Sequence, residues 1–143
     1  MTAVTSKNIS LFLLRVALGL LFFKAGIVKV FDPKWTAAGY LQASKILPDF
    51  YQWFAGAHNI AWVNLLNEWG LTLLGVALIT GLFVRVASIG GIMLMVLYYI
   101  PNIVPGTVII DEHIIYSLAL AVLISCNSGQ FWGLDFFTHK LKP

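Results

Sequence analysis

Residues 15–29 read RVALGLLFFKAGIVK and lie within a long apolar segment that covers approximately residues 9–31. Its length and composition predict an α-helix that crosses a membrane. The segment nevertheless contains three cations, Arg15, Lys24 and Lys29. A cation at the centre of a bilayer costs about 2.5–3.5 kcal/mol on insertion scales. How this helix packs therefore depends on where each of the three charges points.

One face of the predicted helix carries two of the cations together with two glycines. At 100° per residue, five side chains fall within about 40° of one line: Arg15, Gly19, Phe22, Gly26 and Lys29. Glycines let a second membrane helix approach closely, so this face should point into the protein. Lys24 projects from the opposite side. Its four-carbon stem is expected to snorkel toward the interface, and a partner subunit or a bound anion is the alternative.

Composition places the whole chain in a membrane. Of its 143 residues 59% are hydrophobic and only 10% are charged, whereas soluble domains carry about 25% charged residues. The net charge of +3 is dispersed along the chain, which excludes the basic stripe of a nucleic-acid-binding protein. Cys126 is the single cysteine, so no intrachain disulfide or iron–sulfur cluster is possible. The separated histidines predict neither a metal site nor a haem.

Four apolar segments predict an all-α integral membrane four-helix bundle. They cover approximately residues 9–31, 61–83, 84–100 and 112–126, within a single domain over residues 1–143. Four spans place both termini on one side of the membrane. The distribution of lysine and arginine favours the cytoplasm for that side, and hence a multi-pass protein of the cell (inner) membrane.

The connection over residues 32–60 is long for a helical bundle and rich in aromatic rings. Those in and next to it are Trp35, Tyr40, Tyr51, Trp53 and Trp62. One interpretation is an aromatic belt at headgroup depth, to which Tyr98 in the third span would also belong. The other is a lid over a cavity between the helices. Either interpretation makes the connection an interfacial segment.

Glu68 is the only carboxylate within the second predicted span. In an antiparallel helix pair it would lie at the same depth as Lys29, while Arg15 would lie near the other end. We therefore expect Glu68 to pair with Lys29, and Arg15 to bind a separate polar group or a lipid headgroup. Such a pair in a membrane marks a candidate functional site, or it fixes the register of the two helices.

The fourth span opens with IIDEHIIY, residues 109–116. Asp111 suits the positive end of the helix dipole. Glu112 and Tyr116 share one face of the helix and His113 lies on the adjacent face. A carboxylate, an imidazole and a phenol near the interface can relay protons to a quinone-type ring. The alternative is a helix cap within an aromatic belt.

Three stretches together resemble the DoxX-like family of small four-helix membrane proteins. They are RVALGLLFFKAGIVKVFDP, NEWGLTLLGVALITGLFVRVAS and DEHIIYSLALAVLISCNSGQFWGLD. The family includes the DoxD-type subunit of thiosulfate:quinone oxidoreductase, which passes electrons from thiosulfate to a membrane quinone. The positions that match the family's motifs are Arg15, Gly19, Gly26, Lys29, Glu68, Arg85 and the acidic start of the fourth span.

The resemblance implies a membrane subunit of a quinone-linked oxidoreductase, with a quinone as substrate and no metal or haem. Arg15, Lys29 and Tyr116 would bind the substrate. Glu68, His113 and Glu112 would supply protons. Expected partners are the lipid bilayer, other membrane or extracytoplasmic subunits and further copies of the chain, but no nucleic acid.

A non-catalytic anchor or assembly partner of a respiratory or redox complex is the alternative function. The two functions predict different interiors. An oxidoreductase subunit needs a cavity that joins the inward polar face to the membrane. An anchor predicts a dry, filled bundle with a large exposed patch for its partner.

Overall fold

The computed structural model describes residues 3–103 and 110–135, and these residues contain helices but no strand. The four long helices are α1 (Ala3–Phe31), α4 (Ile60–Thr80), α5 (Val84–Asn102) and α6 (Glu112–Ser125). Two short helices, α2 (Ala38–Gln42) and α3 (Pro48–Ala55), lie between α1 and α4, and the 3₁₀ turn η1 (Ser128–Gln130) follows α6. The expected all-α bundle, with an interfacial segment between its first two long helices, is confirmed.

Three of the four long helices are long and apolar enough to cross a membrane: α1 over Thr5–Phe31, α4 and α5. Helix α6 is shorter. Its 14 residues span about 21 Å at 1.5 Å per residue, less than the hydrocarbon core of about 30 Å. The chain is therefore a multi-pass membrane protein whose last long helix does not cross the full hydrocarbon core by length alone.

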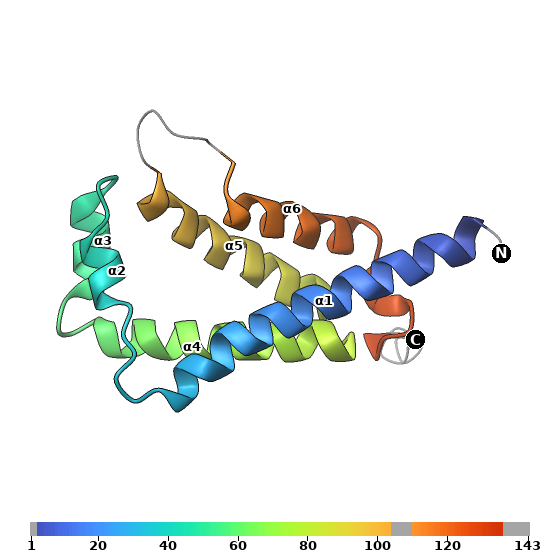
Figure 1. The fold of residues 1–143 in the computed structure, drawn as a ribbon, viewed down its shortest axis with the longest axis horizontal. Coiled ribbons are helices and arrows are strands. Elements are labelled where there is room, and N and C mark those ends of the chain that lie inside the picture. Colours follow the sequence, from blue (N-terminus) through green and yellow to red (C-terminus); the bar gives the residue numbers. More distant parts are fainter. Residues whose placement is uncertain (1–2, 104–109, 136–143) are drawn as a thin grey trace, which may run out of the picture.

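The long helices form two antiparallel pairs, α1 with α4 and α5 with α6 (Figure 1). The pairs lie close together at the end where the described chain begins and finishes, which we call the terminal end. They separate toward the opposite end, where α2 and α3 lie across the bundle (Figure 1). We call this second end the cavity end.

Helices α1 and α4 pack with their backbones in contact because glycines face each other's helix. A Cβ added at Gly75 would lie 2.5 Å from the Cα of Phe23 and 2.6 Å from its Cβ. One added at Gly26 would lie 2.8 Å from the carbonyl oxygen of Glu68 and would meet the backbone nitrogen of Thr72. The glycine face predicted for α1 is the face that α4 covers.

The main core lies between the two helix pairs and consists mainly of apolar side chains. All four long helices contribute buried side chains: Leu18, Phe22, Leu71, Leu74, Leu78, Val84, Met95, Leu120 and Leu123. Helices in a bilayer gain little from the hydrophobic effect, so close packing of these side chains stabilises the bundle instead.

At the terminal end, the fully buried guanidinium of Arg15 holds the turn that follows α6. Its Nη1 donates to the carbonyl of Ser128 at 2.6 Å and to that of Phe131 at 3.1 Å, and its Nη2 donates to the carbonyl of Trp132 at 3.0 Å. Arg15 therefore binds a separate polar group, as expected, and that group is the peptide backbone.

Asp135 completes this end by capping α5. Its carboxylate accepts hydrogen bonds from the backbone nitrogens of Phe83 at 2.7 Å and Val84 at 3.0 Å, and its own nitrogen donates to the carbonyl of Gly81 at 2.9 Å. Gly81 has φ of 69°, a left-handed conformation that suits glycine and ends α4 at Thr80. The helix thus finishes before the predicted boundary at residue 83.

Substitution of the glycines on α4 tests the close contact between α1 and α4. We expect Gly75→Ala to lower the free energy of unfolding by about 1–3 kcal/mol, because the methyl group forces the two backbones apart. Gly70→Ala is the matched control, since a Cβ there has no atom within 4 Å. Alanine favours a helix over glycine, so the control should gain up to about 1 kcal/mol. Reversible unfolding in mixed detergent micelles measures both, and equal effects would contradict the contact.

Candidate functional site

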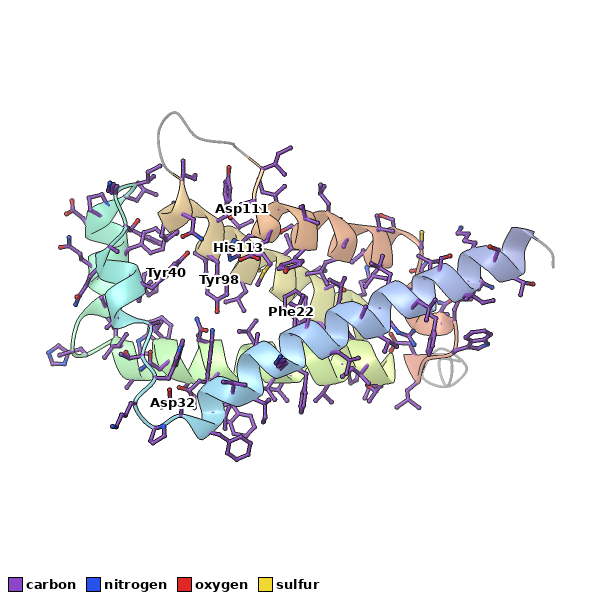
Figure 2. The ribbon with its side chains drawn as sticks, in the orientation of Figure 1. Phe22, Asp32, Tyr40, Tyr98, Asp111 and His113 are labelled. Carbon is purple, nitrogen blue, oxygen red and sulfur yellow. The ribbon has the colours of Figure 1, made fainter. Side chains whose placement is uncertain are left out.

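A cavity of about 360 Å³ lies at the cavity end, between the two helix pairs. Its side walls come from α1, α4, α5 and α6, and residues in and just before α2 line its end, where Tyr40 points toward Tyr98 (Figure 2). Most of the lining residues carry a polar group: Lys29, Asn67, Tyr98, Asn102, Glu112 and His113, with Trp35, Thr36 and Tyr40 on the α2 side. This volume is within the range of sites for small organic ligands, about 300–1,000 Å³.

Lys29 places a cation between aromatic rings in this cavity. Its Nζ donates a hydrogen bond to Oδ1 of Asn67 at 2.7 Å and lies 4.6 Å from the ring centroid of Trp35 and 5.6 Å from that of Tyr98. The Tyr98 hydroxyl donates to the same Asn67 oxygen. An ammonium group carries three N–H donors, and the Asn67 oxygen accepts one of them. Lys29 is therefore suited to donate to an oxygen of a bound ligand.

Glu68 lies beside this cation without being its hydrogen-bond partner. The acceptor 2.7 Å from the Lys29 Nζ is Oδ1 of Asn67, whereas the expected partner was Glu68. Adjacent residues on a helix point 100° apart. Glu68 is half-buried where α4 packs on α1 and is not among the residues that line the cavity.

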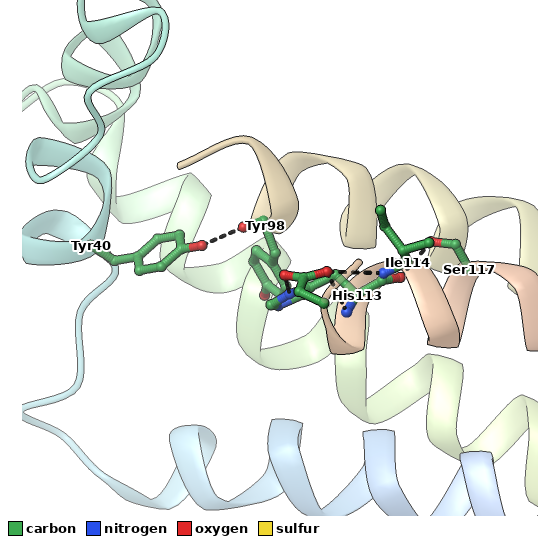
Figure 3. A network of polar contacts seen from close by, with 6 residues as sticks. Tyr40, Tyr98, His113, Ile114 and Ser117 are labelled. Carbon is green, nitrogen blue, oxygen red and sulfur yellow. Dashed lines mark hydrogen bonds and ion pairs between the residues drawn. The ribbon is translucent and has the colours of Figure 1, made fainter. Parts of the chain in front are cut away.

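His113 enters the cavity from the first turn of α6, held by Asp111 (Figure 3). Asp111 caps the helix: its Oδ1 accepts from the backbone nitrogens of His113 at 3.0 Å and Ile114 at 3.2 Å. Its Oδ2 lies 2.7 Å from Nδ1 of His113. A carboxylate can only accept, so Nδ1 carries the proton and Nε2 remains for another partner. The capping interpretation of Asp111 is confirmed, and the same residue orients the imidazole.

Burial opposes the charged form of Asp111, but hydrogen bonds outweigh it. The His113 ring and the backbone N–H of Ile114 stabilise the carboxylate, so the pKa of Asp111 lies below its ordinary value. The ring of His113 packs edge-on against Tyr98, with centroids 5.8 Å apart. The imidazole is thus fixed on one side by a carboxylate and on the other by an aromatic face.

Two tyrosine hydroxyls fasten the connection between α1 and α4 over the cavity. The hydroxyl of buried Tyr51 donates to the carbonyl of Leu97 at 3.0 Å. Within α5 that carbonyl would be bonded by residue 101, which is proline and has no N–H. The Tyr40 hydroxyl donates to the carbonyl of Tyr98 (Figure 3). Burial raises the pKa of Tyr40 to about 12, so this hydroxyl stays protonated and can donate.

The same connection also packs on α4 and has a small core of its own. The side-chain oxygen of Asn64 accepts from the backbone nitrogen of Ala37 at 3.0 Å. Ala37, Leu41 and Tyr51 form a buried cluster. These contacts favour the lid over the aromatic belt for α2 and α3, although Trp53 and Trp62 are exposed as belt residues would be.

The structure brings only part of the predicted site together. Lys29, Glu112 and His113 line the cavity, and Glu68 lies next to it. Arg15 lies 14 residues before Lys29 on the same helix, about 21 Å away at 1.5 Å per residue, and its donors serve the backbone of the terminal end.

Other side chains lie where the sequence did not place them. Tyr116 packs on Phe22 in the core, with ring centroids 5.8 Å apart, and is not among the cavity-lining residues. Asn67 and Tyr98 do line the cavity, although the sequence assigned them no site role. The sequence feature that could have identified Asn67 is its position next to Glu68, in the turn of α4 that lies at the same depth as Lys29.

Two further features bear on what this site can hold. In residues 3–103 and 110–135, no group of three or more His, Cys, Asp or Glu side chains is placed to bind a metal ion. Lys24 is exposed on α1 and is not part of the cavity lining. The groups available in the cavity are a cation, an oriented imidazole, the carboxyl group of Glu112, phenols and amides.

Fold and cavity together define a small multi-pass helical membrane protein with a cavity lined by polar residues at one end. The chain belongs to the DoxX family, whose sequence model matches residues 10–101. That match covers α1 from residue 10 onward, all of α2, α3 and α4, and nearly all of α5. No curated protein matches the chain. No solved structure matches it either.

The pairing of Asp111 with His113 predicts how this carboxyl titrates. Its folded-state pKa is below the unfolded value of about 3.9, so its contribution to stability is present above pH 3.9 and is lost as pH falls through the folded pKa. In a ¹³C NMR titration, the Asp111 carboxyl should therefore titrate below about pH 3.9, and His113→Ala should move its midpoint upward. Identical midpoints in wild type and variant would show that His113 does not stabilise the carboxylate.

Proposed function

We propose that this protein is a membrane subunit of a quinone-linked oxidoreductase and that the cavity binds the quinone ring. The observation that carries the proposal is the grouping of Lys29, Trp35, Tyr98 and His113 around one cavity in a membrane bundle. A dry, filled bundle, which an anchor without a ligand would have, does not provide such a cavity. The proposal retains the quinone chemistry that the family resemblance implies.

The cavity offers a quinone ring both faces and edges to contact. The rings of Trp35 and Tyr98 provide aromatic surface, and aromatic pairs in offset or edge-on geometry add about 0.5–1.5 kcal/mol beyond the area they bury. Lys29 would donate to one quinone carbonyl. A hydrogen bond from a charged donor in a site of low dielectric also stabilises the negative charge that forms on that oxygen during reduction.

Reduction of a quinone to a quinol consumes two electrons and two protons. His113, oriented by Asp111, would pass protons to the ring oxygens, with Glu112 at the cavity wall to resupply it. The electrons would come from thiosulfate, as in the DoxD-type subfamily, or from a partner subunit. With the termini in the cytoplasm, the cavity end would face the outside of the inner membrane.

The alternative function is a membrane anchor that assembles other subunits. Lys24 favours it to some degree, because an exposed cation on a membrane helix can pair with an acidic residue of a partner helix. Binding and assembly are separable, since Lys24 and Lys29 lie on different faces of the same helix.

Binding of a tailless benzoquinone to the purified chain in nanodiscs tests the proposal. We expect Lys29→Met to weaken binding about tenfold or more, because a hydrogen bond from a charged group contributes about 1.5–3 kcal/mol. Lys24→Met is the matched control on the same helix and should bind like the wild type. His113→Ala should lower the rate of quinone reduction, measured with thiosulfate and native membrane partners present, more than it lowers affinity.

The outcomes separate the two functions. Absence of quinone binding by the wild type, or binding that Lys29→Met leaves unchanged, would refute the quinone site. Loss of partner subunits from Lys24→Met, with quinone binding intact, would add the assembly role to the proposal.

A further inference from the structure

A second hollow runs along the outside of the bundle between α4 and α5. Its volume is about 770 Å³, and its lining is apolar along the full length, from Leu66 to Ala77 on α4 and from Phe83 to Leu97 on α5. Gly70 and Gly90 lie in it, and a Cβ added at either would have no atom within 4 Å. The missing side chains leave open space at these two positions. We call this hollow the α4–α5 groove.

The α4–α5 groove and the polar cavity are lined by neighbouring residues of the same two helices. Leu66 and Leu97 line the groove, and the residues that follow them, Asn67 and Tyr98, line the cavity. The Tyr98 hydroxyl donates to Asn67 across the space between the two helices. One pair of side chains therefore separates a polar site from an apolar groove on the same two helices.

The length and lining of the groove suit a hydrocarbon chain. Residues 66–77 of α4 rise about 16 Å at 1.5 Å per residue, and the lining is apolar over that whole length. Gly70 and Gly90, where the groove has open space, lie on its two opposite walls.

We infer that the α4–α5 groove binds the hydrocarbon tail of the same amphiphilic ligand whose polar ring occupies the cavity, and that the ligand enters sideways from the bilayer. The inference rests on the proposed function, because it assigns the tail of the quinone proposed there. Sideways entry is consistent with the lid, since α2 and α3 are fastened over the end of the cavity by Tyr40 and Tyr51. The Asn67–Tyr98 hydrogen bond separates the groove from the cavity and has to open for the ligand to pass.

Packing, rather than the hydrophobic effect, holds the tail in the groove. A tail that leaves the bilayer for the groove exchanges one apolar environment for another, so the gain comes from contacts with the groove walls. The groove should therefore contribute to the position of the tail and modestly to affinity. Filling the groove should weaken binding of a tailed quinone and leave a tailless quinone unaffected.

The experiment uses the full chain in phosphatidylcholine nanodiscs and two probes with the same ring. One is a benzoquinone with a polyprenyl tail that carries a diazirine, and the other has a methyl group in place of the tail. We expect photolabelling on groove residues of α4 and α5, and we expect an excess of the tailless ring to displace it, because both probes need the cavity.

Two groove-filling variants test the site from opposite walls. Gly90→Leu and Gly70→Leu should each abolish the displaceable label and raise the ratio of tailed to tailless dissociation constants about fivefold, which is about 1 kcal/mol of lost packing. Ala17→Leu is the control, because Ala17 is exposed on α1 outside the groove. The control should retain the label and the ratio of the wild type.

Each other result overturns the inference in a distinguishable way. If the tailed probe labels the groove and the tailless quinone does not displace it, the probe occupies the groove as bulk lipid would, without its ring in the cavity. Displaceable labelling elsewhere means that the tail takes another route while the quinone site stands. If neither probe binds in a manner that depends on Lys29, the proposed function itself fails.

Discussion

Backbone contact between α1 and α4 determines where the polar groups of this bundle lie. Gly26 sits against the carbonyl of Glu68 and the backbone of Thr72, and this register brings Lys29 within 2.7 Å of Asn67. A side chain larger than hydrogen at Gly26 or Gly75 would separate the helices and move both ends of the pair. The glycines thus act on the candidate site without touching it.

Arg15 and Lys29, the two cations of α1 that point into the protein, have different roles at opposite ends of the contact between α1 and α4. Arg15 is fully buried and gives its hydrogen bonds to backbone carbonyls. Losing those bonds would leave buried polar groups unpaired, at a cost of about 1–3 kcal/mol each. Lys29 is only half-buried and faces a cavity. The first cation stabilises the fold, and the second supplies the charge that a ligand can use.

Much of the fold could be predicted from the sequence because the helices depend on local sequence patterns. The length of the apolar segments predicted the long helices, the glycine spacing predicted which face of α1 is covered, and Asp111 was placed correctly as a helix cap. The ends of helices depended on finer detail. Thr80 is the last residue of α4 because Gly81 is left-handed and its carbonyl is bound by Asp135, a contact between residues distant in sequence.

The site was less accessible because it depends on contacts between helices. The depth of Lys29 in the antiparallel pair predicted that its partner lies in one particular turn of α4. Neighbouring residues in that turn point 100° apart, so depth alone does not decide between them. The partner is Asn67, whereas Glu68 was expected. The lid depends on Tyr51 reaching the Leu97 carbonyl that Pro101 leaves without a helical partner. Nothing in either segment alone indicates that these residues meet.

Infrared spectroscopy of a bound benzoquinone labelled with ¹³C at one carbonyl tests whether Lys29 donates a hydrogen bond to a quinone in the cavity. We expect one carbonyl stretch to lie at lower frequency in the protein than in lipid alone. We also expect the shift to disappear in Lys29→Met and to persist in Lys24→Met. A carbonyl stretch that matches the quinone in lipid, or a shift that survives Lys29→Met, would contradict this hydrogen bond.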